Sequence, residues 1–184
     1  DPRADHAVAA RSAPTDGEPT EPHTASTDRW PTADPAVVEA AAQAAANAAS
    51  AREKVLALLT HLDQIVGKTR SPLPSKEPKG GRALPPAVLE KGEGSALERC
   101  DLFVTLCRAS GVPARLVAGW RPDLRKPHVW AEVHLTGEGW IPVDPATVWL
   151  GTSTRYLPLS LSEDGTLPLL HLDRPRVRKT QGSR

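Results

Sequence analysis

The spacing of apolar residues predicts two helices in the first third of the chain. Between residues 51 and 66 the apolar positions recur with the period of an α-helix. These positions are Val55, Leu58, Leu59, Leu62, Ile65 and Val66. Ser50-Ala51-Arg52-Glu53 is a capping box that favours a helix start. Upstream, Asp34-Pro35 supplies an N-cap and a first-turn proline for an Ala-rich helix reaching about Asn47. We expect both helices to cover the core.

Farther along, the pattern changes to the two-residue period of half-buried strands. In residues 128–135, positions that carry His, Trp or Glu alternate strictly with positions that carry Val, Ala or Leu. Other strands are expected from Pro113 to about Gly119 and over residues 140–143. Glu163-Asp164-Gly165-Thr166 is typical of a tight turn between extended pieces over 156–161 and 167–172. The chain is therefore expected to be an α+β protein whose helices pack on a small antiparallel sheet.

Length and composition predict one folded domain. The chain has 184 residues, 39% of them hydrophobic, which suffices for a single core. Residues 1–34 have almost no large apolar side chain, so we expect a disordered tail there. The domain then covers residues 35–172, and a basic C-terminal tail covers 173–184. No apolar run approaches the roughly 18 residues that a membrane span requires.

The net charge of +1 conceals two basic segments. Residues 67–86 are rich in Pro and Gly and carry Lys68, Arg70, Lys76, Lys79 and Arg82. We interpret this segment as a basic surface loop, which is either a solvated connector or the rim of a cleft that attracts acidic substrates or partners. The C-terminal tail has the same two interpretations. Because no aromatic residue is interleaved with its basic ones, nucleic-acid binding is not expected.

The two cysteines, Cys100 and Cys107, lie on one predicted helix. Their spacing separates them by about 10.5 Å along the helix axis, which excludes a disulfide between them. We expect both to be small buried hydrophobes, and they indicate no redox compartment.

A candidate reactive site begins at Ser95-Ala96-Leu97-Glu98, a capping box that opens the helix ending near Gly111. A helix N-terminus stabilises a thiolate and can hold an oxyanion, but Ala96 has no atom that could attack a substrate. His128 lies on the alternating strand. Asp144 follows the strand over 140–143, where its carboxylate could accept the ring N–H of His128 and fix the imidazole.

Other uses of these residues are less well supported. His128, Glu132 and His134 share one strand face, but residues four apart on a strand lie roughly 13 Å apart, so His128 and Glu132 cannot hold one metal ion. Cys100 lies a full turn from Ala96, roughly 6 Å along the axis, and is expected to be buried rather than to replace a nucleophile. Arg115 is expected to be a structural ion-pair partner.

The order of these motifs resembles the transglutaminase-like superfamily. Members commonly carry Gly-x-Cys where this chain has Gly94-Ser95-Ala96, and Arg-x-x-Gly-Val-Pro-Ala-Arg where it has Arg108 to Arg115. The patterns His-x-Trp-x-Glu-Val and Gly-Trp-x-x-x-Asp-Pro also occur here, beginning at His128 and Gly139. The resemblance places the family's catalytic cysteine on Ala96, its general base on His128 and its third member on Asp144. It implies a papain-like fold and no cofactor.

The resemblance further implies a cysteine acyltransferase or peptidase that acts on a peptide or protein through a Cys-His-Asp triad. With Ala96 in place of the nucleophile, this chain is expected to be inactive, through natural loss or through an engineered Cys-to-Ala change. The alternative is a non-catalytic module that binds peptides or proteins in the same cleft. Substrate, hydrolysis versus transfer, and oligomeric state are left open. The chain begins at Asp1 and has no Met, so an exported protein that has lost its signal peptide is one interpretation.

Overall fold

The computed structural model describes residues 17–68, 81–121, 126–151 and 156–166. Its helices are a short 3-10 helix Glu21–His23, α1 Pro35–Ala45, α2 Ala51–Ile65, α3 Pro85–Lys91 and α4 Ala96–Ala109. Its strands are β1 Gly67–Lys68, β2 Glu93–Gly94, β3 Ala114–Arg121, β4 Lys126–Leu135, β5 Gly139–Asp144, β6 Trp149–Leu150 and β7 Leu157–Ser162. The extended piece predicted over 167–172 and the basic tail over 173–184 lie outside the described residues.

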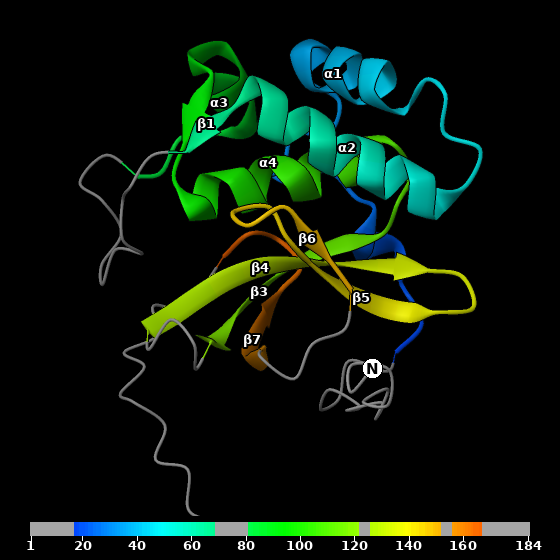
Figure 1. Ribbon diagram of the computed structural model, residues 1–184, viewed down its shortest axis with the longest axis vertical. Helices are drawn as coiled ribbons and strands as arrows, with labels where there is room; N and C mark the ends of the chain where they lie inside the picture. Colours follow the sequence, from blue (N-terminus) through cyan, green and yellow to red (C-terminus); the bar gives the residue numbers. More distant parts are fainter. Residues whose placement is uncertain (1–16, 69–80, 122–125, 152–155, 167–184) are drawn as a thin grey trace, which may run out of the picture.

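The elements form two layers, a helical layer and a sheet (Figure 1). The five-stranded sheet has the order β6-β5-β4-β3-β7, with each neighbouring pair antiparallel. The helix that packs directly on it is α4, which lies against β3 and β4. Val129, Ala131 and Val133 belong to the buried core, as their alternation in β4 predicts. The predicted α+β architecture with a small antiparallel sheet is confirmed.

The helix boundaries follow local signals in the sequence. Asp34 accepts a hydrogen bond from the Ala36 amide at the start of α1, and Ser50 accepts one from the Glu53 amide at the start of α2. At α4, the Ser95 hydroxyl accepts from the Glu98 amide while the Glu98 carboxylate accepts from the Ser95 amide at 2.9 Å. This reciprocal capping box fixes the start of α4.

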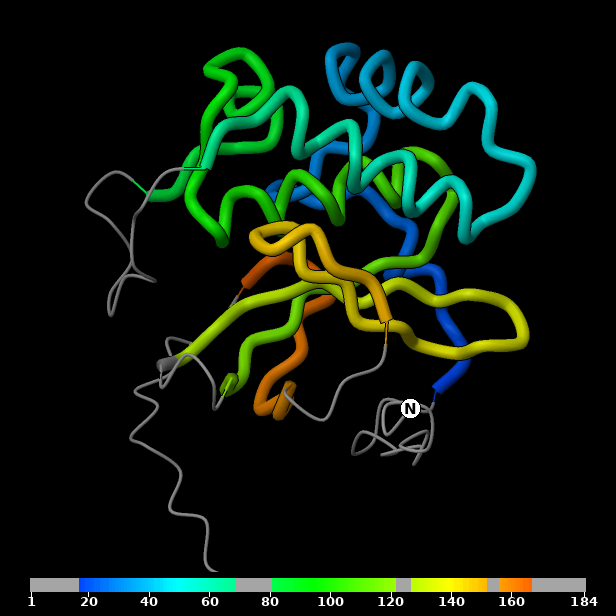
Figure 2. The backbone as a smooth tube through the Cα atoms, viewed as in Figure 1, coloured from blue at the N-terminus to red at the C-terminus, as the bar shows by residue number. Residues whose placement is uncertain are grey.

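Residues 17–34 do not form the disordered tail that was predicted. Trp30 is fully buried, its indole N–H donates to Asp101 at 2.9 Å, and the guanidinium of Arg108 lies 4.4 Å from the centre of its ring. At the start of the segment, the indole of Trp140 donates to the Gly17 carbonyl. Figure 2 shows this blue segment passing from the sheet to the helical layer. The prediction was wrong here because the average composition concealed one large anchoring side chain; residues 1–16 lie outside the described part.

The predicted basic surface loop is wrong for one of its members. The Arg82 side chain is only 5% exposed, and its Nε donates to Asp101 at 2.6 Å. Lys68 does lie at the surface, where it pairs with Asp63. The remaining basic residues of the loop, Arg70, Lys76 and Lys79, lie outside the described residues. Arg82 therefore belongs to the core of the domain and not to a rim that could attract acidic partners.

The other structural expectations concern the cysteines and the membrane. Cys100 and Cys107 are both free and fully buried, as predicted. Within the described ranges, no helix is long and apolar enough to cross a membrane.

Gly119 is expected to tolerate no side chain, because a Cβ there would lie 2.1 Å from the Leu157 carbonyl oxygen and 2.5 Å from Trp130. We expect Gly119→Ala to lower the free energy of unfolding by about 3 kcal/mol, since β7 must shift to make room. Urea denaturation measures the change. Gly17→Ala is the control, because a Cβ there meets nothing within 4 Å. Equal stability of the two variants would contradict the close approach of β7 to β3.

Candidate functional site

The site is built around a hydrogen bond between two buried side chains. The Nε2 atom of His128 lies 2.8 Å from Oδ2 of Asp144, as the sequence predicted. His128 is 6% exposed and Asp144 is fully buried. Strand β4 carries the histidine and the end of β5 carries the aspartate, so two neighbouring strands of the sheet hold the pair together.

The Asp144 carboxylate has further donors that the sequence did not predict. Arg121 Nη1 and the Tyr156 hydroxyl each donate to Oδ2 at 2.9 Å, and the Ala146 amide donates to Oδ1 at 3.0 Å. Burial alone would raise the pKa of Asp144. The hydrogen bond and charge of His128, together with the Tyr156 hydrogen bond, outweigh that effect and hold the pKa below its usual value.

An aromatic wall lies beside the pair. The ring of Tyr156 is 5.0 Å from that of Trp130, edge-on, and 5.0 Å from that of Trp149, stacked. The ring centre of His128 lies 6.4 Å from that of Trp130. Trp130 is almost fully buried, and its indole N–H has no acceptor among the described residues. Trp130 and Tyr156 thus lie beside the imidazole.

Helix α4 contacts the chain segments that carry both residues. The thiol of Cys100 lies 3.7 Å from the carbonyl of Val129, the residue after His128. Arg99 Nη2 donates at 3.0 Å to the carbonyl of Pro145, the residue after Asp144. In Figure 1 the connection between β5 and β6 accordingly lies next to α4. The first turn of α4 is thus near the site.

Ala96 is the first residue of α4 and is half-buried. It lies one turn ahead of Cys100 on the same side of the helix, about 6 Å along the axis. Burial raises the pKa of the Cys100 thiol well above its usual value, so this cysteine is held as an inert thiol. That the Cβ of Ala96 points toward the imidazole stays a prediction.

His128 is paired with Gly119 of β3 and lies beyond the part of β4 that pairs with β5. The β4–β5 ladder runs from Leu135↔Gly139 to Ala131↔Val143, so the first part of β4 extends past the end of β5. In β4, His128 belongs to the opposite alternation set from Val129, whose face packs in the core.

Glu132 and His134, on the same face of β4 as His128, have structural partners. Arg115 donates through Nε and Nη2 to one oxygen of Glu132, at 2.9 and 2.8 Å, and both side chains are buried. Arg115 is therefore the ion-pair partner that was expected. The ring of His134 packs edge-on against Trp140, 5.4 Å away.

The turn after Asp144 contains a strained residue. Val148 has a φ of 55°, which a β-branched side chain rarely adopts, and it is 37% exposed. We expect Val148→Asn to raise the free energy of unfolding by about 1 kcal/mol, because asparagine adopts this conformation more readily. Chemical denaturation measures the gain. Val38→Asn, at an exposed helical valine, should give none; an equal gain there would show that strain is not the cause.

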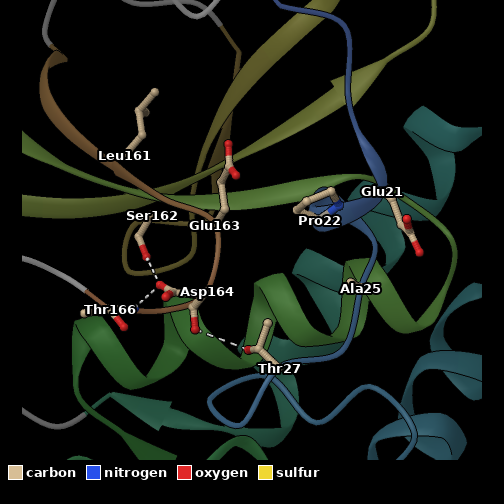
Figure 3. A pocket seen from close by; sticks show the side chains of 9 residues that line it. All are labelled: Glu21, Pro22, Ala25, Thr27, Leu161, Ser162, Glu163, Asp164 and Thr166. Carbon is tan, nitrogen blue, oxygen red and sulfur yellow. Dashed lines mark hydrogen bonds between the residues drawn. The ribbon is translucent and has the colours of Figure 1, made fainter.

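A pocket of about 620 Å³ lies elsewhere, between the N-terminal segment and the end of β7 (Figure 3). Its walls include Glu21, Pro22 and Glu163. Its central carboxylate, Asp164, is already engaged by the Ser162 hydroxyl and the Thr166 amide. The pocket is thus separate from the His128–Asp144 pair, and its polar groups hold the turn after β7 together.

A solved structure shares the fold, and a second one matches more weakly. A candidate cysteine protease from Cytophaga hutchinsonii matches with a TM-score of 0.64 and 19% identity, over 78% of this chain and 46% of its own. The periplasmic domain of TgpA from Pseudomonas aeruginosa matches with a TM-score of 0.48 and 23% identity, over 70% of this chain and 49% of its own. The chain thus spans about half the length of each of these structures. No curated protein matches the chain.

The family model of the transglutaminase-like superfamily matches residues 38–145, which is more than half of the chain and includes most of α1, all of α2 to α4, His128 and Asp144. The chain therefore belongs to the transglutaminase-like superfamily.

Proposed function

We propose that this chain is a transglutaminase-like cysteine acyltransferase or peptidase domain in which Ala96 occupies the nucleophile position. As it stands, the chain binds its peptide or protein substrate without turning it over. The observation that supports this proposal best is the buried hydrogen bond between His128 and Asp144. Such a pair orients an imidazole for proton transfer to and from a neighbouring nucleophile.

The surroundings of residue 96 favour the same role. As the first residue of α4 it lies where backbone N–H groups and the helix dipole stabilise negative charge. A thiol there would have a lowered pKa, and the same N–H groups could bind an oxyanion. His128 binds Asp144 through Nε2, which leaves Nδ1 as the ring nitrogen for a thiol.

With a cysteine at position 96 the reaction would run in two steps. Nδ1 of His128 takes the thiol proton while the sulfur adds to an amide carbonyl carbon, and the proton passes to the leaving amine as the C–N bond breaks. Water or a second amine then attacks the thioester and restores the thiol. Ala96 has no sulfur, so the thioester cannot form and the chain retains only the ability to bind its substrate.

The experiment that tests the proposal is alkylation of an Ala96→Cys variant over a range of pH, with and without His128→Ala. A thiol that reacts at low pH, and depends on His128 for this, supports the proposal. An ordinary thiol profile that ignores His128 would overturn it. In that case the alternative function, a binding module whose cleft was never catalytic, takes its place.

A further inference from the structure

We propose that Arg121 and Tyr156 are positioning residues that fix the Asp144 carboxylate and, through it, the imidazole of His128. This inference rests on the proposed role of His128 and Asp144. Both residues bind the Asp144 carboxylate, so their role is to position it and not to react. They act through the carboxylate that both of them bind.

The geometry gives the two residues a shared target. Arg121, at the end of β3, and Tyr156, just before β7, donate to the same oxygen that binds His128, each at 2.9 Å. They also bind each other: Arg121 Nη1 lies 3.2 Å from the Tyr156 hydroxyl, and its guanidinium lies 4.9 Å from the centre of the ring. Asp144, at the end of β5, is thus held from the end of β3 and from the residue before β7, and its carboxylate cannot rotate without breaking these contacts.

The ionised carboxylate of Asp144 determines which ring nitrogen of His128 donates to it. An ionised carboxylate can only accept hydrogen bonds. Asp144 is held ionised by its donors, so the contact at 2.8 Å requires Nε2 of His128 to be the donor. A neutral His128 then has its lone pair on Nδ1. Arg121 and Tyr156 bind the same carboxylate oxygen, so they hold the acceptor of this hydrogen bond in place.

Other charged and titratable groups face the pair from α4. Arg99 lies close enough to attract Asp144 electrostatically while it binds the Pro145 carbonyl. The Cys100 thiol faces the same region and is uncharged, because burial raises its pKa. Neither donates a hydrogen bond to the Asp144 carboxylate among the contacts of the described residues. Apart from His128 and the residues of the turn after Asp144, the described residues that donate directly to this carboxylate are Arg121 and Tyr156.

The experiment follows the NMR signal of the Asp144 carboxyl carbon as the pH is changed. It uses the chain as it is, with Ala96, because this measurement does not require a nucleophile. In the parent, Asp144 should titrate below the ordinary value. We expect Tyr156→Phe to raise the pKa of Asp144, because it removes one hydrogen bond to the ionised form, and Arg121→Gln to raise it as well, because it removes a charged donor. Arg121→Lys keeps the charge and should restore most of the parent value. Tyr156→Phe removes one oxygen and keeps the ring contacts, so it tests the proposal even if Arg121→Gln does not fold.

Arg115→Gln is the matched control. Arg115 is a buried arginine on the same strand, but it binds Glu132 and lies six residues from Arg121, roughly 20 Å along β3. It should leave the Asp144 titration unchanged. An Asp144 pKa that does not respond to Arg121→Gln or Tyr156→Phe, or that responds equally to Arg115→Gln, overturns the inference. Because the Ala96→Cys experiment measures thiol reactivity, failure of the proposed function is distinguishable from failure of this inference.

Discussion

In the Ala96→Cys variant, the rate of labelling by iodoacetamide is expected to change by less than about 3-fold between pH ~6 and ~8. An ordinary thiol with a pKa of about 8.5 would gain roughly 80-fold over the same range, because its thiolate fraction grows with pH. The flat profile is expected because the start of α4 and His128 together would hold the new thiol as a thiolate throughout.

The controls for this variant are already present in the chain. Cys100 and Cys107 are fully buried, and burial raises the pKa of both thiols, so the parent should label hardly at all. His128→Ala in the Ala96→Cys background should bring back the steep profile of an ordinary thiol. A profile that is steep from the outset and the same without His128 would refute the catalytic geometry.

The parts of the fold that depend on local sequence could be predicted. The N-cap at Ser50 and the capping box at Ser95 act over four residues, and both mark real helix starts. The alternation along residues 128–135 sets which positions face the core, whatever strand pairs with β4. The pairing of His128 with Asp144 could also be expected, because each residue belongs to a recognisable sequence motif on one of two neighbouring strands.

The parts that depend on single long-range contacts could not be predicted. Trp30 is anchored by Asp101, which lies 71 positions away in the sequence, and nothing around Trp30 indicates this partner. Arg121 and Tyr156 reach Asp144 only because β3 and β7 flank the site, and that register is set by tertiary pairing. The composition of residues 67–86 predicted that Arg82 lies in a basic surface loop. Its side chain is buried instead, because it binds the buried carboxylate of Asp101.

That carboxylate is the basis of the last prediction. Arg82→Leu is expected to lower the free energy of unfolding by about 3–5 kcal/mol at pH ~8, because it leaves the Asp101 carboxylate buried without its cation. Asp101 is fully buried, and Arg82 contacts it through Nε at 2.6 Å and also donates to the Gly165 carbonyl. Without Arg82, the Trp30 indole would still donate to the Asp101 carboxylate.

The cost should depend on pH. Burial raises the pKa of Asp101 to about 6, and the attraction of Arg82 opposes this rise, so removing Arg82 raises the pKa further. A carboxyl whose pKa is raised in the folded state adds stability below its unfolded pKa of about 3.9, and this is lost as the pH rises through the folded value. The Arg82→Leu penalty should therefore be smaller at pH ~5 than at pH ~8 in urea denaturation. Adding Asp101→Asn to Arg82→Leu keeps an uncharged acceptor for Trp30 and should recover more than half of the lost free energy of unfolding. If Arg82→Leu costs the same at both pH values and Asp101→Asn recovers nothing, the ion pair does not determine stability here.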